Sequence, residues 1–194
     1  MSEFFLYLDL GFEHILDING YDHMLFVIAL CVAYTLSDWK KLLVLITAFT
    51  IGHSITLALS TFHVVDWSTE VIEFLIPTTI LATAILNLFK KERFGRPKTI
   101  GWSYGMALLF GLIHGLGFSN YLKALLGKNA DIVMQLLAFN LGLELGQIVV
   151  VLVFMTITVL MINLFGVTKR DWRMIISSAV AGIALTIMIE TKFW

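Results

Sequence analysis

Long apolar runs separated by short polar connections dominate this chain and limit what it can fold into. Crossing the hydrocarbon core of a bilayer takes roughly 20 predominantly apolar residues. Runs of suitable length lie at about residues 21–37, 41–62, 70–89, 99–121, 132–164 and 173–191. Of the 194 residues, 59% are hydrophobic and 14% are charged, whereas soluble domains are about 45–50% apolar. The sequence therefore predicts an all-α integral membrane protein, a bundle of about six transmembrane helices forming one domain, residues 1–194.

An additional helix is predicted before the first long run. Residues 3–16 place aromatic and aliphatic side chains close to one helical face, with the carboxylates Glu3, Asp9 and Glu13 elsewhere. This pattern is typical of an interfacial or re-entrant helix, which would bring the total to seven. Because no basic stretch precedes it, we do not expect it to be a cleaved signal peptide.

The distribution of basic residues predicts how the bundle is oriented. Cytoplasmic loops carry an excess of Lys and Arg. The first, third and fifth connections between runs contain Lys40 and Lys41; Lys90, Lys91, Arg93, Arg96 and Lys98; and Lys169, Arg170 and Arg173. The second connection has none, and the fourth has only Lys123 and Lys128. We therefore expect the odd-numbered connections to be cytoplasmic and both termini to lie outside.

Composition excludes several classes of function. Cys31 is the single cysteine, so the chain can form neither an internal disulfide nor a thiolate metal site. The formal net charge is −1, and the basic residues form short clusters between the apolar runs, which argues against binding to nucleic acid.

Glycines recur at four-residue spacing within the runs. The pairs are Gly101 and Gly105, Gly111 and Gly115, and Gly142 and Gly146. Small residues at this spacing allow helix backbones to approach closely in lipid. We expect these glycines to pack helices within the chain, and the same faces could also pair two copies into a homo-oligomer.

Ionisable groups occur inside the apolar runs. His53 lies in TIGHSIT, His114 in FGLIHGLGF and Glu144 in FNLGLELGQ, while Asp22 and His23 open the first run. A charged side chain at this depth costs about 2.5–3.5 kcal/mol on insertion scales, so such residues usually mark a site or a pathway. The orientation set by Lys and Arg places nearly all of them in the outer half. They therefore predict one cluster that opens to the non-cytoplasmic side.

The residue types in this cluster predict a metal centre. Imidazole together with carboxylate suits divalent transition metals, whereas Mg²⁺ and Ca²⁺ prefer oxygen ligands alone. The predicted ligands are His14, Asp22, His23, His53, His114 and Glu144. Four further residues are predicted to orient the ligands or to line a pathway: Asp17, Glu73, Asn140 and Gln147. The expected partners are the lipid bilayer and a divalent ion, with nickel, cobalt and zinc as candidates.

Each of these residues also has a purely structural interpretation. A histidine in a membrane helix can donate to a backbone carbonyl, and Asp22 and His23 can form a solvated helix start. His63 lies in the second connection, where a solvated histidine is expected. Glu144 has the fewest alternatives, because no Lys or Arg lies in any run at its depth.

Six sequence blocks, taken in order, resemble the HupE/UreJ family of small bacterial membrane proteins. They are GFEHIL, YDHMLF, TAFTIGHSITL, IEFLIP, FGLIHGLGF and FNLGLELGQ. The resemblance covers nearly the whole chain and implies a nickel or cobalt permease of the bacterial inner membrane. It also implies that His14, Asp22, His23, His53, His114 and Glu144 bind the metal.

Two details depart from the nickel permeases that this chain resembles. Seven residues separate His14 from Asp22, whereas five do so in those permeases. The permeases also carry two histidines in a later motif, Phe-His-Gly-x-Ala-His-Gly. This chain has only the second, His114, and Phe110 stands where the first would fall.

Three functions are compatible with these patterns. The first is transport of a divalent transition metal. The second is a membrane-embedded zinc hydrolase, in which three histidines hold the ion and Asp22 or Glu144 is the general base toward a lipid or other amphipathic substrate. The third is a metal-binding accessory subunit without transport. The inner halves of the runs hold few polar groups, which fits an enzyme better than a channel.

Overall fold

The computed structural model describes residues 2–18, 20–89, 100–126 and 132–194. In this part of the chain all regular structure is helical, which confirms the all-α prediction. The helices are α1 (Glu3–Leu16), α2 (Asp22–Cys31), the 3-10 helix η1 (Leu36–Asp38), α3 (Trp39–Thr61), α4 (Thr69–Leu88), α5 (Ile100–Leu126), α6 (Ile132–Asn163) and α7 (Lys169–Glu190). The basic residues predicted to orient the third connection, and Lys128, lie outside the described residues.

Four segments are long and apolar enough to cross a membrane by length and composition. They are Leu36–Thr61, Thr69–Leu88, Ile132–Asn163 and Lys169–Glu190. The segment Ser103–Ser119 of α5 is apolar and shorter. At 1.5 Å per residue, α6 is about 48 Å long, so the fifth apolar run forms one helix that is longer than a hydrocarbon core.

The first apolar run differs from its prediction. Instead of one helix over residues 21–37, α2 ends at Cys31 and is only about 15 Å long. A local interaction explains why the helix does not extend to residue 37. Thr35 and Asp38 form a capping box that starts η1 at Leu36. The chain must turn between Cys31 and this new helix start. A single helix therefore cannot continue through the run.

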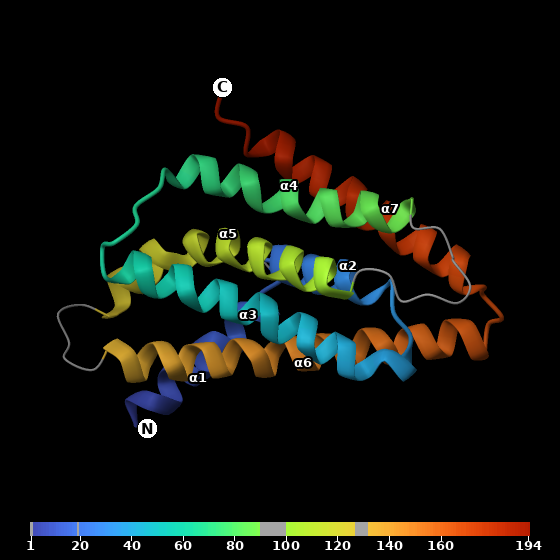
Figure 1. Ribbon diagram of the computed structural model, residues 1–194, viewed down its shortest axis with the longest axis horizontal. Helices are drawn as coiled ribbons and strands as arrows, with labels where there is room; N and C mark the ends of the chain where they lie inside the picture. The colour runs from blue at the N-terminus through green and yellow to red at the C-terminus, as the bar shows by residue number, and fades with distance from the viewer. Residues whose placement is uncertain (1, 19, 90–99, 127–131) are drawn as a thin grey trace.

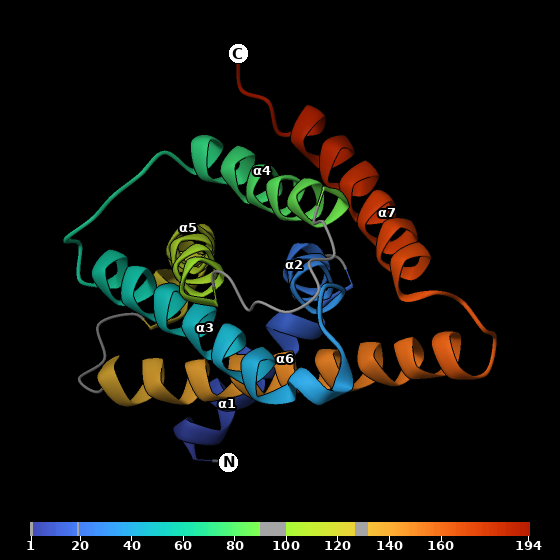
Figure 2. The ribbon, with the colours of Figure 1, turned by 45° about the vertical axis from the view of Figure 1, so that its right-hand side comes forward.

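The helices associate as three packed pairs around a short central helix. The most extensive contacts are those of α3 with α5, α1 with α6 and α4 with α7. Helix α2 lies between the pairs and contacts α4, α6, α7 and α3 (Figure 1 and Figure 2). The three pairs surround α2 on different sides, so side chains from different pairs can meet next to this helix.

Glycine allows two of these pairs to form. A methyl group at Gly111 would collide with the carbonyl of Phe49 across the α3–α5 contact. At the α1–α6 contact, a methyl group at Gly142 would collide with the carbonyl of Leu8. The prediction of close packing is wrong for Gly101 and Gly105, which face open space.

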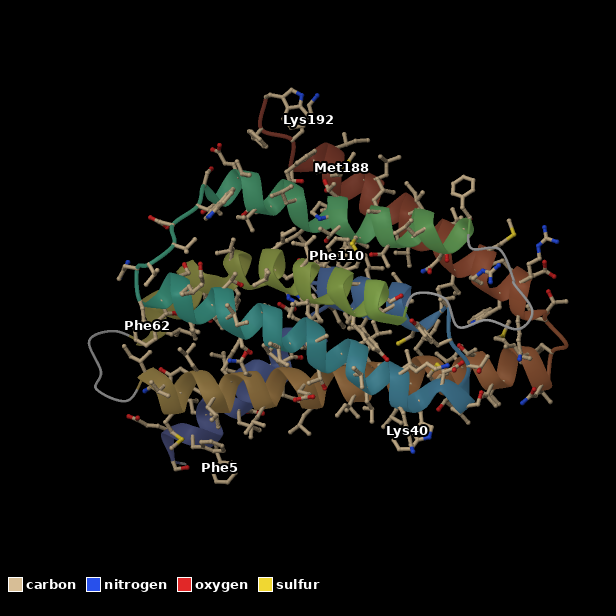
Figure 3. All side chains as sticks on the ribbon, in the orientation of Figure 1. Phe5, Lys40, Phe62, Phe110, Met188 and Lys192 are labelled. Carbon is tan, nitrogen blue, oxygen red and sulfur yellow. The ribbon has the colours of Figure 1, made fainter. Side chains whose placement is uncertain are left out.

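The two ends of the bundle differ in their basic residues. Figure 3 shows Phe62 and Lys40 toward opposite ends of the long axis, at the end and at the start of α3. Helix α7 also begins at the end that holds Lys40, with Lys169, Arg170 and Arg173 in its first turns. Both chain termini lie on the opposite side, toward Phe62 (Figure 1). This arrangement agrees with the predicted order of connections.

The substitution Gly111→Ala tests the glycine contact. Forcing a methyl group against the α3 backbone is expected to destabilise the protein by about 1–3 kcal/mol, because neither helix backbone can move without disturbing the pair. Thermal unfolding in detergent, followed by circular dichroism, measures the change. Gly105→Ala in the same helix is the matched control, and it should leave stability unchanged or slightly raised because alanine favours helix. Equal effects of the two substitutions would contradict the assigned contact.

Candidate metal centre

Three imidazoles from three helices converge near the middle of the bundle. His14 lies in the last turn of α1, His23 in the first turn of α2 and His53 in the middle of α3. One nitrogen atom of each ring lies within 4.8 Å of one nitrogen atom of each of the other two. The ring centroids of His14 and His23 are 4.6 Å apart, and those of His23 and His53 are 5.8 Å apart. The longer spacing between His14 and Asp22 therefore does not separate His14 from the cluster.

Four ring nitrogens of this cluster are buried without hydrogen-bond partners in the described part of the chain. His53 is 0% exposed and His23 is 4% exposed. Among the described residues, no group hydrogen-bonds with Nε2 of His14, Nε2 of His23 or either ring nitrogen of His53. A buried polar atom without a partner costs about 1–3 kcal/mol. Several on neighbouring rings fit a site that is completed by an ion.

A carboxylate fixes the orientation of His23. Oδ1 of Asp22 accepts from the backbone N–H of His23 at 2.8 Å and lies 3.0 Å from its Nδ1. An ionised carboxylate can only accept, so Nδ1 of His23 donates and its Nε2 keeps a free lone pair. This is the arrangement by which carboxylates commonly orient metal-binding histidines. Asp22 therefore orients His23 through Oδ1, and its predicted role as a metal ligand stays a prediction.

His114 lies beside the three imidazoles. Its Nδ1 donates to the carbonyl of Phe110 at 2.8 Å, which leaves Nε2 as an acceptor that is buried and has no partner in the described part of the chain. Its ring centroid is 5.2 Å from that of His23. Its nitrogens do not belong to the group that lies within 4.8 Å. A role as fourth ligand stays a prediction.

Glu144 does not belong to the group of imidazoles whose nitrogens lie within 4.8 Å of one another. Oε1 of Glu144 accepts a hydrogen bond from Thr47 at 2.7 Å, and Oε1 of Gln147 accepts one from Thr50 at 2.9 Å. The side-chain amide of Asn140 donates to the carbonyl of Leu136 on its own helix. None of the hydrogen bonds described for these three residues reaches a histidine of the cluster.

Helix geometry explains this position. Gly142 and Gly146 face α1, and Glu144, two residues from each, points about 200° around the helix from them. It therefore faces α3 rather than the side that holds His14. The sequence placed these groups at a similar depth, but it contained no information on the rotation of α6.

A cavity of about 910 Å³ reaches His14 and His23. Its walls come from four helices, α1, α2, α4 and α5, and from the connection between α1 and α2. The carboxylates that line it are Glu13, Asp17, Asp22 and Glu73. No Lys or Arg is among the described lining residues, so the cavity concentrates cations. Asp17 and Glu73 line this cavity, and their role in a pathway stays a prediction.

Two contributors were not found from the sequence. Glu13 adds a fourth carboxylate to the cavity wall, and its position next to His14 was the available signal. Phe118 packs its ring 4.0 Å from that of His14, measured between centroids, and it also lines the cavity. An aromatic residue in an apolar run gives no sign of such a contact.

Four long apolar segments, suited by length and composition to cross a membrane, and a buried group of three imidazoles define an all-helical protein with a candidate metal centre. The family model described as "HupE / UreJ protein" matches residues 1–192, and the chain belongs to the HupE/UreJ family. Comparisons with curated proteins and with solved structures gave no match. The family is associated with nickel and cobalt transport, which agrees with a metal-related function.

The substitution Asp22→Asn tests the orientation of His23. It should weaken binding of Ni²⁺, Co²⁺ or Zn²⁺ by about 10–100-fold, because removing the partner of a metal-binding histidine typically costs that much. Isothermal titration calorimetry on the purified protein measures the affinity. Asp9→Asn, an exposed position on α1, is the control. Unchanged affinity in Asp22→Asn would contradict the assigned role.

Proposed function

We propose that this chain binds a divalent transition-metal ion and carries it across the bacterial inner membrane. The observation that supports this most is the set of three imidazoles, His14, His23 and His53, with nitrogens within 4.8 Å of one another. Each ring has at least one buried nitrogen without a hydrogen-bond partner among the described residues. Membership of the HupE/UreJ family supports the same function. We assign nickel or cobalt as the ion, with zinc as the alternative.

The proposed topology has six crossings. Helices α3, α4, α5, α6 and α7 make one crossing each, and α1 and α2 together make the remaining one. Two observations support a shared crossing. Helix α1 packs along α6 through Gly11, and the amide of Asn87, near the end of α4, donates to the carbonyl of Ala29, near the end of α2. The Lys and Arg pattern orients the end of the bundle near Lys40 toward the cytoplasm.

The acidic cavity is the proposed entrance from the non-cytoplasmic side. Four carboxylates attract a hydrated cation to a space that ends at His14 and His23. Imidazole nitrogens then replace water molecules around the ion. The ion also brings positive charge next to the half-buried carboxylate of Asp22, which lines the cavity and is hydrogen-bonded to His23.

The predicted nitrogen ligands favour a transition-metal ion of intermediate softness. Neutral imidazole suits nickel, cobalt and zinc, while copper(I) prefers thiolate or thioether ligands. Cys31 is the one thiol of the chain, and it lies in the last turn of α2, whereas His23 lies in the first. The proposed site therefore relies on nitrogen ligands.

Uptake of ⁶³Ni²⁺ or ⁵⁷Co²⁺ into proteoliposomes tests the proposal. Protein-containing vesicles should accumulate the ion along its gradient, and His53→Ala should reduce the initial rate at least about tenfold, because a lost ligand weakens capture. His63→Asn is the control, since asparagine tolerates the positive φ of this exposed position. Uptake that is equal in protein-free vesicles, or unaffected by His53→Ala, would contradict transport through this site.

A second function is favoured by the cavity itself. Its volume of about 910 Å³ far exceeds that of a hydrated ion and falls in the range of pockets that hold small molecules. Three histidines with one open position on Zn²⁺ could activate water for hydrolysis. We assign this alternative to an amphipathic substrate such as a lipid ester, because the cavity combines apolar walls with carboxylates.

Hydrolysis of short-chain phospholipid and glycerolipid esters by the Zn²⁺-loaded protein tests this alternative. An enzyme should release fatty acid with multiple turnovers, and both His23→Ala and removal of zinc should abolish the activity. Mass spectrometry of the products measures the turnover. Absence of zinc-dependent release, together with uptake of nickel or cobalt, would leave transport as the function.

A further inference from the structure

A second group of polar side chains joins α3 to α6. We define the α3/α6 seam as Thr47, Thr50, Glu144 and Gln147. Thr47 donates to Glu144 at 2.7 Å and Thr50 donates to Gln147 at 2.9 Å. These bonds lie within the contact between α3 and α6, which joins the α3–α5 pair to the α1–α6 pair.

The seam lies between the imidazoles and the end of the bundle near Lys40. His53, Thr50 and Thr47 are spaced three residues apart on α3, so they follow one helical face. Each step moves about 4.5 Å along the helix toward its start. The seam therefore begins one turn away from His53 and continues in the direction that the proposed path requires.

The seam contains a carboxylate without a positive partner. Ion pairs within the described residues join His23 to Asp22 and Lys41 to Asp38, and none includes Glu144. A single hydroxyl donates to it. In the proposed topology this carboxylate lies within the bilayer, where an uncompensated charge is costly.

Unpartnered amide atoms surround the same position on α6. Asn140 lies one turn before Glu144, and its Oδ1 is buried without a partner among the described residues. Gln147 is 1% exposed, and its Nε2 has no partner there either. Oxygen and nitrogen of an amide are assigned from hydrogen bonds. Exchanging them would let Nε2 donate to Thr50 and would leave Oε1 as another free acceptor.

We infer that the α3/α6 seam is a second cation site, built from oxygen ligands, where a divalent ion stops after it leaves the imidazoles. The carboxylate of Glu144, the hydroxyls of Thr47 and Thr50 and the amide oxygen of Gln147 are its ligands. This inference rests on the proposed transport function. Oxygen ligands bind nickel, cobalt or zinc less tightly than imidazole does, so an ion on the seam is released more readily toward the cytoplasm.

Titration with Mn²⁺ tests this site, because Mn²⁺ prefers oxygen ligands and zinc competes better for imidazole. The purified full-length protein is loaded with one equivalent of Zn²⁺, and Mn²⁺ is then added while free Mn²⁺ is followed by electron paramagnetic resonance. The wild-type protein should bind one further equivalent of Mn²⁺ without imidazole nitrogen coupling in its pulsed spectrum. Glu144→Gln should weaken that binding at least about tenfold. Thr47→Val, which removes one hydroxyl, should weaken it less.

Controls separate this site from its neighbours. Glu70→Gln, at an exposed carboxylate in the first turn of α4, should leave Mn²⁺ binding unchanged. Loss of Mn²⁺ binding in Glu73→Gln alone would place the ion in the acidic cavity and overturn the inference. Absence of Mn²⁺ binding, or binding unaffected by Glu144→Gln and Thr47→Val, would overturn it as well. Failure of the Zn²⁺ step would instead contradict the proposed imidazole centre, so the two failures are distinguishable.

Discussion

Direct contact between helix backbones is the constraint on which the rest of this structure depends. In lipid, helices gain little from burying apolar surface, and close van der Waals packing becomes the main attraction. Gly111 and Gly115 receive the backbone of α3 on either side of His53, whose own backbone atoms they meet. The α3–α5 contact therefore fixes the position of one imidazole. Gly11 and the glycines of α6 fix the helix that carries another.

The interruption between α1 and α2 brings His14 and His23 together. His14 belongs to the last turn before the interruption, and His23 belongs to the first turn after it. Irregular backbone within a membrane is tolerated where it lines a cavity. The connection does so through Asp17, Ile18 and Gly20. The same interruption therefore positions two imidazoles, part of the cavity wall and the carboxylate that orients His23.

Charge is distributed along the proposed path in a way that suits capture followed by release. Carboxylates line the cavity, His14 and His23 lie where it ends, and hydroxyl, amide and carboxylate oxygens join α3 to α6. Nitrogen ligands favour nickel, cobalt and zinc more strongly than oxygen ligands do. The strongest proposed site thus lies next to the entrance, and the weaker one lies further along.

The sequence by itself determined the helical class, most helix positions and the identity of the histidines, because apolar period and buried polar residues are local properties. Thr35 and Asp38 are a local signal for a new helix start that the length of the apolar run does not show. Only the tertiary structure decided that His14, His23 and His53 converge while Glu144 binds Thr47. The rotation of α6 about its own axis decides which helix Glu144 faces, and the glycine contacts with α1 fix that rotation. Residue spacing within one helix does not show which side chains of a neighbouring helix lie opposite.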